Sequence, residues 1–280
     1  MTHHIIRPDI EGVAAAIAKH GLSAVQLNLE SAGLPPLPST FDPALCRRIR
    51  AAFDDRDLVI SGLSGTFNVI DPDSAKVRDH VARFDVLARW CRELGCNVIT
   101  ACTGTRHPAS MWRFHPENAL PESWRAMVET MRQITTIAEA SDVTIAFEPE
   151  VVNVVDTAAK ARRLIEEVGS DHLRVVMDPA NYFHPPMLVH MDEVLDAVFE
   201  QVGAFIALGH AKDVRGPDIG GTECVRPAAG TGMLDYTRYM RLLRASGFDG
   251  GLIMHSLSEL EVAASAAYVR RFLDAEAQSG

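Results

Sequence analysis

Four strand-like runs in the second half of the chain each end in a side chain that can bind a metal ion. Glu148 closes the run VTIAFE, Asp178 closes LRVVMD, His210 closes AFIALGH, and His255 closes GGLIMH. Each run is apolar, then turns polar and is followed by a helix-like segment. In a parallel β/α barrel the carboxyl ends of the strands meet at one face, so these side chains would converge there. The sequence therefore predicts an α/β fold with one site built from these four positions.

A regular alternation of strand-like and helix-like segments runs along the whole chain. Short apolar, β-branched runs predict strands at 4–7, 23–29, 58–63, 97–102, 143–148, 173–178, 204–210 and 251–255. Amphipathic spacing and capping signals predict helices at 9–20, 43–54, 73–94, 122–140, 157–168, 191–202, 235–246 and 258–275. The first strand, around His4–Arg7, is very short. Eight such pairs predict a (β/α)8 TIM barrel that forms a single domain over residues 1–280.

Composition narrows the function classes. The net charge is −10 and the chain has no block of basic residues, which argues against a nucleic-acid or anionic-membrane partner. No GxGxxG motif marks a dinucleotide site. The five cysteines form no CxxC pair, and no apolar run approaches the length of a membrane helix. Because the start of the chain also lacks the pattern of a secretory signal, we expect a cytoplasmic protein with free thiols.

The four side chains suit one divalent metal ion. Carboxylates favour hard cations, and imidazole extends the choice to the transition metals, so the ion would be Mn2+, Co2+, Mg2+, Fe2+ or Zn2+. A metal with open positions can bind substrate oxygens and polarise a carbonyl next to the carbon that loses a proton. Each position also has a structural alternative: an ion pair for Glu148, a turn cap for Asp178, and a buried core histidine for His210 or His255.

The motifs that surround these residues carry a resemblance to a known family. The segments FEPE, DPANYF, GHAKD and GFDGGLI resemble those of the xylose isomerase-like TIM barrels, the sugar phosphate isomerase/epimerase superfamily. In that family the metal is held by Glu, Asp, His and a second Glu. The resemblance assigns the first three places to Glu148, Asp178 and His210. It places Asn181 where relatives have the His of a DxxH motif.

The last strand departs from the family pattern, because it carries His255 where the epimerases place their second Glu. A histidine can bind the metal, but it is a different acid or base from a carboxylate. The two-glutamate proton transfer of the family therefore cannot apply unchanged. We expect Glu148 to act as the base and His255, or else His184, as the second acid or base. Glu259 lies four residues further on and is expected in the final helix.

Residues around the metal are expected to bind the substrate. Lys212 and Arg215 follow His210 and would neutralise an enediolate, a carboxylate or a phosphate. The long loop after the fourth strand adds Arg106 and Trp112, and loops at this face of a barrel commonly carry function. The expected substrate-binding residues are Asn181, His184, Lys212, Arg215, Arg106 and Trp112.

The resemblance implies a metal-dependent isomerase or epimerase that removes a proton next to the carbonyl of a sugar or sugar phosphate. A lyase or dehydratase acting on a polyhydroxy ketone is the first alternative, and the loss of the second Glu favours it. A non-catalytic sugar-binding barrel is the second alternative. A phosphodiesterase acting on DNA is disfavoured, since it needs a site with several zinc ions and the chain is acidic. The expected partner is a small carbohydrate, and family habit suggests a homodimer.

Overall fold

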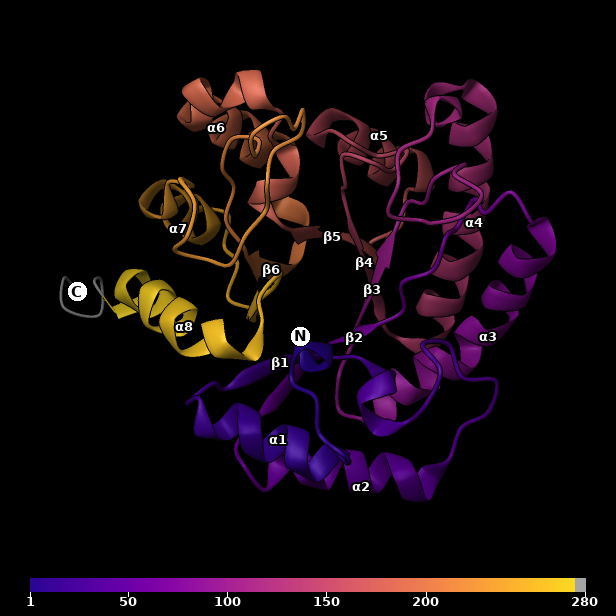
Figure 1. Cartoon of the computed structure of the whole chain (residues 1–280). Coiled ribbons are helices and arrows are strands. Elements are labelled where there is room, and N and C mark those ends of the chain that lie inside the picture. The colour runs from indigo at the N-terminus through magenta and orange to yellow at the C-terminus, as the bar shows by residue number, and fades with distance from the viewer. Residues whose placement is uncertain (275–280) are drawn as a thin grey trace.

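The computed structural model describes residues 1–274 and has the strands of a TIM barrel at its centre, with the helices around them (Figure 1). Within these residues, seven strands form one parallel sheet in chain order. The strands are β1 (Ala24–Leu27), β2 (Val59–Ser64), β3 (Val98–Cys102), β4 (Thr144–Glu148), β5 (Leu173–Met177), β6 (Ile206–Ala211) and β7 (Leu252–Met254). All seven lie within runs expected to be strands, give or take one residue.

A helix follows each strand and another precedes the first. The α-helices are α1 (Ile10–Lys19), α2 (Pro43–Asp54), α3 (Ser74–Glu93), α4 (Pro121–Ser141), α5 (Ala158–Val168), α6 (Met191–Val202), α7 (Tyr236–Ala245) and α8 (Glu259–Asp274). Short 3-10 helices are η1 (Thr2–His4), η2 (Leu29–Ala32), η3 (Pro116–Ala119), η4 (Pro179–Tyr182), η5 (Pro185–His190) and η6 (Gly203–Phe205). The predicted cap on α2 is confirmed, because Asp42 accepts hydrogen bonds from the backbone N–H groups of Ala44 and Leu45.

The prediction of a first strand at His4–Arg7 is wrong. The chain begins with the 3-10 helix η1, in which the N–H groups of His4 and Ile5 bond to the carbonyls of Met1 and Thr2. These local bonds use backbone groups that a strand would offer to its neighbours. Pro8 follows directly and lacks an N–H group, so it could not have extended a ladder toward α1.

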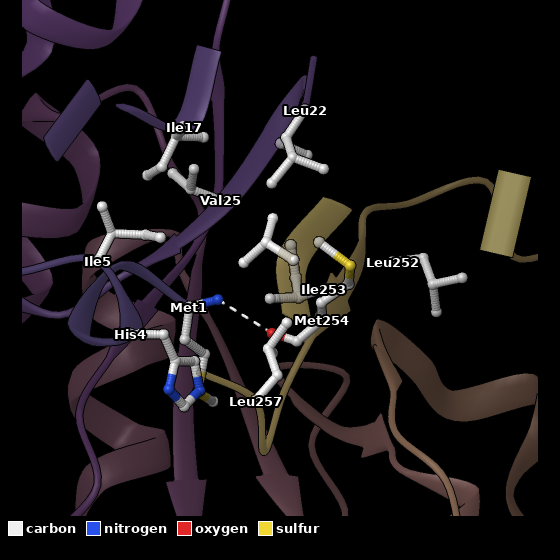
Figure 2. Close-up of a pocket in the computed structure, with 12 residues that line it drawn as sticks. Met1, His4, Ile5, Ile17, Leu22, Val25, Leu252, Ile253, Met254 and Leu257 are labelled. Atoms are coloured by element: carbon white, nitrogen blue, oxygen red, sulfur yellow. Dashed lines mark hydrogen bonds between the residues drawn. The ribbon is translucent and has the colours of Figure 1, made fainter. Parts of the chain in front are cut away.

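The N-terminal turn instead lies across the carboxyl ends of the two edge strands. The Thr2 hydroxyl accepts a hydrogen bond from the N–H of Asn28 just after β1, and the Met1 nitrogen donates to the Met254 carbonyl at the end of β7. Behind it is an apolar cavity of about 60 Å³ between β1 and β7 (Figure 2). The turn therefore covers the gap that an eighth strand would close.

The core is formed by apolar side chains of the strands and the inner faces of the helices. On α4 the predicted apolar stripe is buried, including Trp124, Met127, Met131, Ile134 and Ala138. All five residues of β3 are buried. Among residues 1–274, no helix combines the length and the apolar character needed to cross a membrane.

Candidate metal centre

The four residues singled out in the sequence converge at the carboxyl ends of β4 to β7. Glu148 is the last residue of β4, Asp178 directly follows β5, His210 lies in β6, and His255 directly follows β7. One ligand atom from each lies within 4.8 Å of the others. Because neighbouring parallel strands end at the same edge, four consecutive strands place their ends side by side. This convergence is what the spacing along the sequence predicts.

The two imidazoles turn the same ring nitrogen toward the carboxylates. The Nδ1 atom of His210 lies 3.4 Å from Glu148 Oε1 and 3.6 Å from Asp178 Oδ2, and Nδ1 of His255 lies 3.8 Å from Asp178 Oδ2. Both Nδ1 atoms are buried and have no hydrogen-bond partner among the residues that the structure describes. An unpartnered buried nitrogen is costly, and a cation between the four side chains would satisfy both. The donor set, two carboxylates and two imidazoles, therefore fits a divalent metal ion.

The charges of the site agree with that fit. Burial opposes the charged form of His210, but Glu148 and Asp178 outweigh it and raise its pKa to about 9. Burial also opposes ionisation of Asp178, yet Lys212 and the imidazoles keep the pKa of its carboxyl well below the usual range. Burial lowers the pKa of His255. Two buried carboxylates thus require positive charge beside them, which a proton or a metal ion can supply.

Lys212 and Asn181 hold the carboxylates in place. The Lys212 ammonium donates to Asp178 Oδ2 and to Asn181 Oδ1, each at 3.0 Å. Asn181 Nδ2 in turn donates to Glu148 Oε1 at 2.8 Å and to the Pro149 carbonyl at 3.2 Å. Both side chains are buried. Both side chains therefore bind the candidate metal ligands in this structure, and their role in substrate binding remains a prediction.

The three polar residues of the GHAKD segment, His210, Lys212 and Asp213, have different roles. His210 faces the cluster, Lys212 binds Asp178, and Asp213 organises the loop that follows β6. The carboxylate of Asp213 accepts hydrogen bonds from the N–H groups of Val214, Gly230 and Leu234. A side chain at Gly232 would collide with that carboxylate, since an added Cβ would lie 2.3 Å from Asp213 Oδ1.

The other predicted substrate-binding residues lie outside the cluster. The Arg106 guanidinium donates to Ser123 Oγ and to the Ile70 carbonyl, which braces the loop after β3. Arg215 pairs with Asp218 in the loop after β6. Trp112 is 55% exposed, and His184 is exposed at the start of η5. Their roles remain predictions.

Three residues of the site region were not foreseen from the sequence. Gln26 in β1 bonds to His210 across the barrel. Burial and the charge of Glu148 raise the pKa of Glu150 to about 7. The His4 ring lies 5.8 Å from that of His255, so the N-terminal turn reaches the edge of the site. The sequence did contain a signal for two of them, because Gln26 is a polar residue in the apolar run SAVQLNL and Glu150 is the second acid of FEPE. The position of His4 depends on the N-terminal 3-10 turn and had no such signal.

Comparison with known proteins establishes the family. The family model described as xylose isomerase-like TIM barrel matches residues 14–272. The chain belongs to this family. The resemblance inferred from the motifs FEPE, DPANYF and GHAKD is confirmed, and so is the predicted fold class. No curated protein matches the chain.

Several solved structures share the fold at low sequence identity. The apo form of the 3-keto-D-glucoside 4-epimerase YcjR from E. coli is 16% identical, with a TM-score of 0.72 over 95% of this chain and 96% of that one. A xylose isomerase-like TIM barrel protein from Mycobacterium smegmatis in complex with magnesium is 15% identical, with a TM-score of 0.70 over 95% and 88%. D-psicose 3-epimerase from Clostridium cellulolyticum with D-tagatose is 15% identical, with a TM-score of 0.69 over 95% and 94%.

Proposed function

We propose that the protein is a divalent-metal-dependent isomerase or epimerase of a sugar or related polyhydroxy ketone. The observation that carries the proposal is the four-residue cluster with two buried, unpartnered imidazole nitrogens that face two carboxylates. A bound divalent cation would supply Lewis-acid polarisation of a substrate carbonyl at this place. The solved structures with the same fold include two sugar epimerases, which supports the substrate class.

Exposure divides the four side chains into two pairs. Asp178 and His210 have fully buried side chains, whereas Glu148 retains 13% exposure and His255 22%. A substrate that enters from the open side of the barrel meets the second pair first. Glu148 and His255 are therefore the proposed proton carriers, in line with the roles expected from the sequence. Asp178 and His210 would serve as ligands only.

The neighbouring residues keep the two carboxylates apart and oriented. Asn181 holds Glu148 Oε1, which leaves Oε2 free to accept a proton. Lys212 donates to both Asp178 Oδ2 and Asn181 Oδ1, and it supplies a fixed positive charge beside the reacting centre. Such preorganised charge stabilises an enediolate more effectively than mobile water does.

A metal-dependent lyase or dehydratase is the second candidate, and the residue at the end of β7 favours it. An epimerase must return a proton to the carbon it has deprotonated, and the family does so with a second Glu. His255 stands at that place here. If the imidazole instead protonates a departing β-hydroxyl, the same enediolate loses water. The identity of the product distinguishes these two reactions.

Metal analysis of the purified protein is the first test. We expect about one equivalent of Mn, Co, Fe or Zn in the wild type after treatment with a weak chelator, and a large loss of it in His255→Ala. The control is His190→Ala, which removes an exposed histidine of η5 whose nearest acid is Glu193 at 3.7 Å. A wild type that binds no metal even after soaking would reject the proposal and favour a non-catalytic sugar-binding barrel.

Isotope exchange then separates the candidate reactions. With keto-sugars in deuterated water, an isomerase or epimerase incorporates solvent deuterium into both substrate and product. A dehydratase yields a deoxy-keto product in which a hydroxyl has been lost. If His255→Ala keeps its metal but no longer exchanges deuterium into the substrate, His255 acts as an acid or base rather than as a metal ligand.

A further inference from the structure

A buried glutamine of β1 contacts the four-residue cluster through His210. Gln26 belongs to β1, is 1% exposed, and lies 184 residues before its partner. Its Oε1 atom is 2.9 Å from His210 Nε2, and its own Nε2 donates to Thr100 Oγ1 of β3 at 3.0 Å. Strand β1 contributes no residue to the cluster itself. Among residues 1–274, its polar contact with the cluster passes through His210.

The contact decides which ring nitrogen of His210 can bind a metal. A neutral imidazole has one N–H group and one lone pair. When the Gln26 carbonyl oxygen accepts from Nε2, the proton is on Nε2 and the lone pair is on Nδ1. Nδ1 is the atom that faces Glu148 and Asp178 at 3.4 and 3.6 Å. The alternative tautomer would present an N–H group to the cluster and could not act as a ligand.

The hydrogen bond to Gln26 also fixes the orientation of the His210 ring. His210 has no other hydrogen bond to Nε2, and its side chain is fully buried. Loss of the acceptor would leave a buried N–H unsatisfied, which costs more than the bond itself contributes. The ring could then rotate or change tautomer to find another partner, and in either case Nδ1 would leave its place.

We propose that Gln26 is a positioning residue that sets the tautomer of His210 for metal binding. This inference rests on the proposed metal site. Hydrogen-bond partners of metal-bound histidines act in this way, and their removal weakens metal affinity by roughly 10- to 100-fold. Gln26 performs this task from β1, which does not pair with β6, and Thr100 holds its amide group in turn.

Two substitutions separate positioning from packing. Gln26→Met keeps the length and volume of the side chain but removes the acceptor. Gln26→Glu keeps the acceptor and, when ionised, can only accept. If the residue serves only to fill the barrel, the Met variant should bind metal normally. If it sets the tautomer, the Glu variant should retain affinity and the Met variant should not.

The measurement is the dissociation constant for Zn2+, obtained by competition with a chromogenic chelator. We expect a 10- to 100-fold weaker constant for Gln26→Met and a value within a few-fold of wild type, or tighter, for Gln26→Glu. Gln133→Met, which changes an exposed glutamine of α4, is the matched control. Thermal melting of the metal-free proteins verifies that each variant folds.

A second readout reports the tautomer directly. In spectra of the zinc-loaded, 15N-histidine-labelled protein, His210 should carry its proton on Nε2 in the wild type and in Gln26→Glu. Equal zinc affinity in wild type and a folded Gln26→Met would overturn this inference and leave the metal site intact. If Gln26→Met does not fold, a Gln26→Glu variant that binds zinc with wild-type affinity supports the inference, and one that has lost its affinity overturns it. A wild type that binds no zinc would overturn the proposed function and this inference together.

Discussion

Replacement of Lys212 by Met is expected to destabilise the metal-free protein strongly. Lys212 is 4% exposed, and its ammonium lies 3.0 Å from Asp178 Oδ2. At an effective dielectric constant of about 20, two unit charges at this 3.0 Å separation attract each other by about 5 kcal/mol. Removal of one partner of a buried ion pair typically costs about 3–5 kcal/mol, because the other charge is left uncompensated.

The expected loss is large enough to measure by thermal melting with a chelator present. A loss of about 3–5 kcal/mol corresponds to a fall in melting temperature of about 5–9 °C, because a chain of this size has an unfolding entropy of roughly 0.6 kcal/mol/K. The control is Lys160→Met, which removes a half-exposed lysine paired with Asp156 at 2.8 Å on the surface of α5. Such exposed pairs contribute about 0–1 kcal/mol, so this variant should melt close to wild type.

Metal should reverse part of the effect. A divalent cation beside Asp178 supplies the positive charge that the Met variant lacks, so saturating metal should narrow the gap between Lys212→Met and wild type. Removal of a competing positive charge should also tighten metal binding. A metal-free Lys212→Met protein that melts within about 2 °C of wild type would refute the reasoning, because Asp178 would then not depend on Lys212 for its charge.

Three further predictions address other parts of the chain. The buried Nδ1 of His80 has no hydrogen-bond partner among the described residues, and burial lowers the pKa of this imidazole, so protonation below about pH 6.5 favours the unfolded chain. The melting temperature of His80→Phe should therefore exceed that of wild type by more at pH 5 than at pH 8. An equal difference at both pH values would contradict this prediction. Glu259 begins α8 and pairs with Arg7, so Glu259→Gln should leave metal content unchanged and cost under about 1 kcal/mol in melts. His255→Glu restores a carboxylate ligand and should raise the Mn2+ affinity relative to Zn2+ in competition titrations, with an unchanged ratio as the opposing result.

The convergence of the four candidate ligands could be predicted from the sequence because these residues share a simple rule of position. Each ends a short apolar strand, and consecutive parallel strands end at one edge of a barrel. The same rule could not find Gln26, which lies in the middle of β1 and acts through a contact across the barrel interior. Contacts of this kind depend on the diameter of the closed sheet rather than on the pattern of any one strand.

The first strand was predicted wrongly because a short apolar run does not distinguish a strand from a turn. His4–Arg7 has the right length and position, but the N–H groups of His4 and Ile5 bond locally, to the carbonyls of Met1 and Thr2. The roles of Arg106 and Arg215 were equally open, since a loop arginine can bind a substrate or brace its own loop. Here Ser123 and Asp218 are their nearest partners, and only the folded chain reveals this.

The irregular edge of the barrel borders β7, the strand that precedes His255. The ladders join β4, β5, β6 and β7 with one register shift, between Val175 and Val176 of β5, and these strands carry all four candidate ligands. The edge that lacks a strand is covered by the N-terminal turn, which brings His4 toward His255. His255, which stands where the sequence resemblance leads us to expect a carboxylate, therefore borders the N-terminal turn. Among the described residues, β7 pairs with another strand only at β6, and on its other side the Met1 nitrogen donates to the Met254 carbonyl. The position of His255 therefore depends on the N-terminal turn as well as on the ladder to β6.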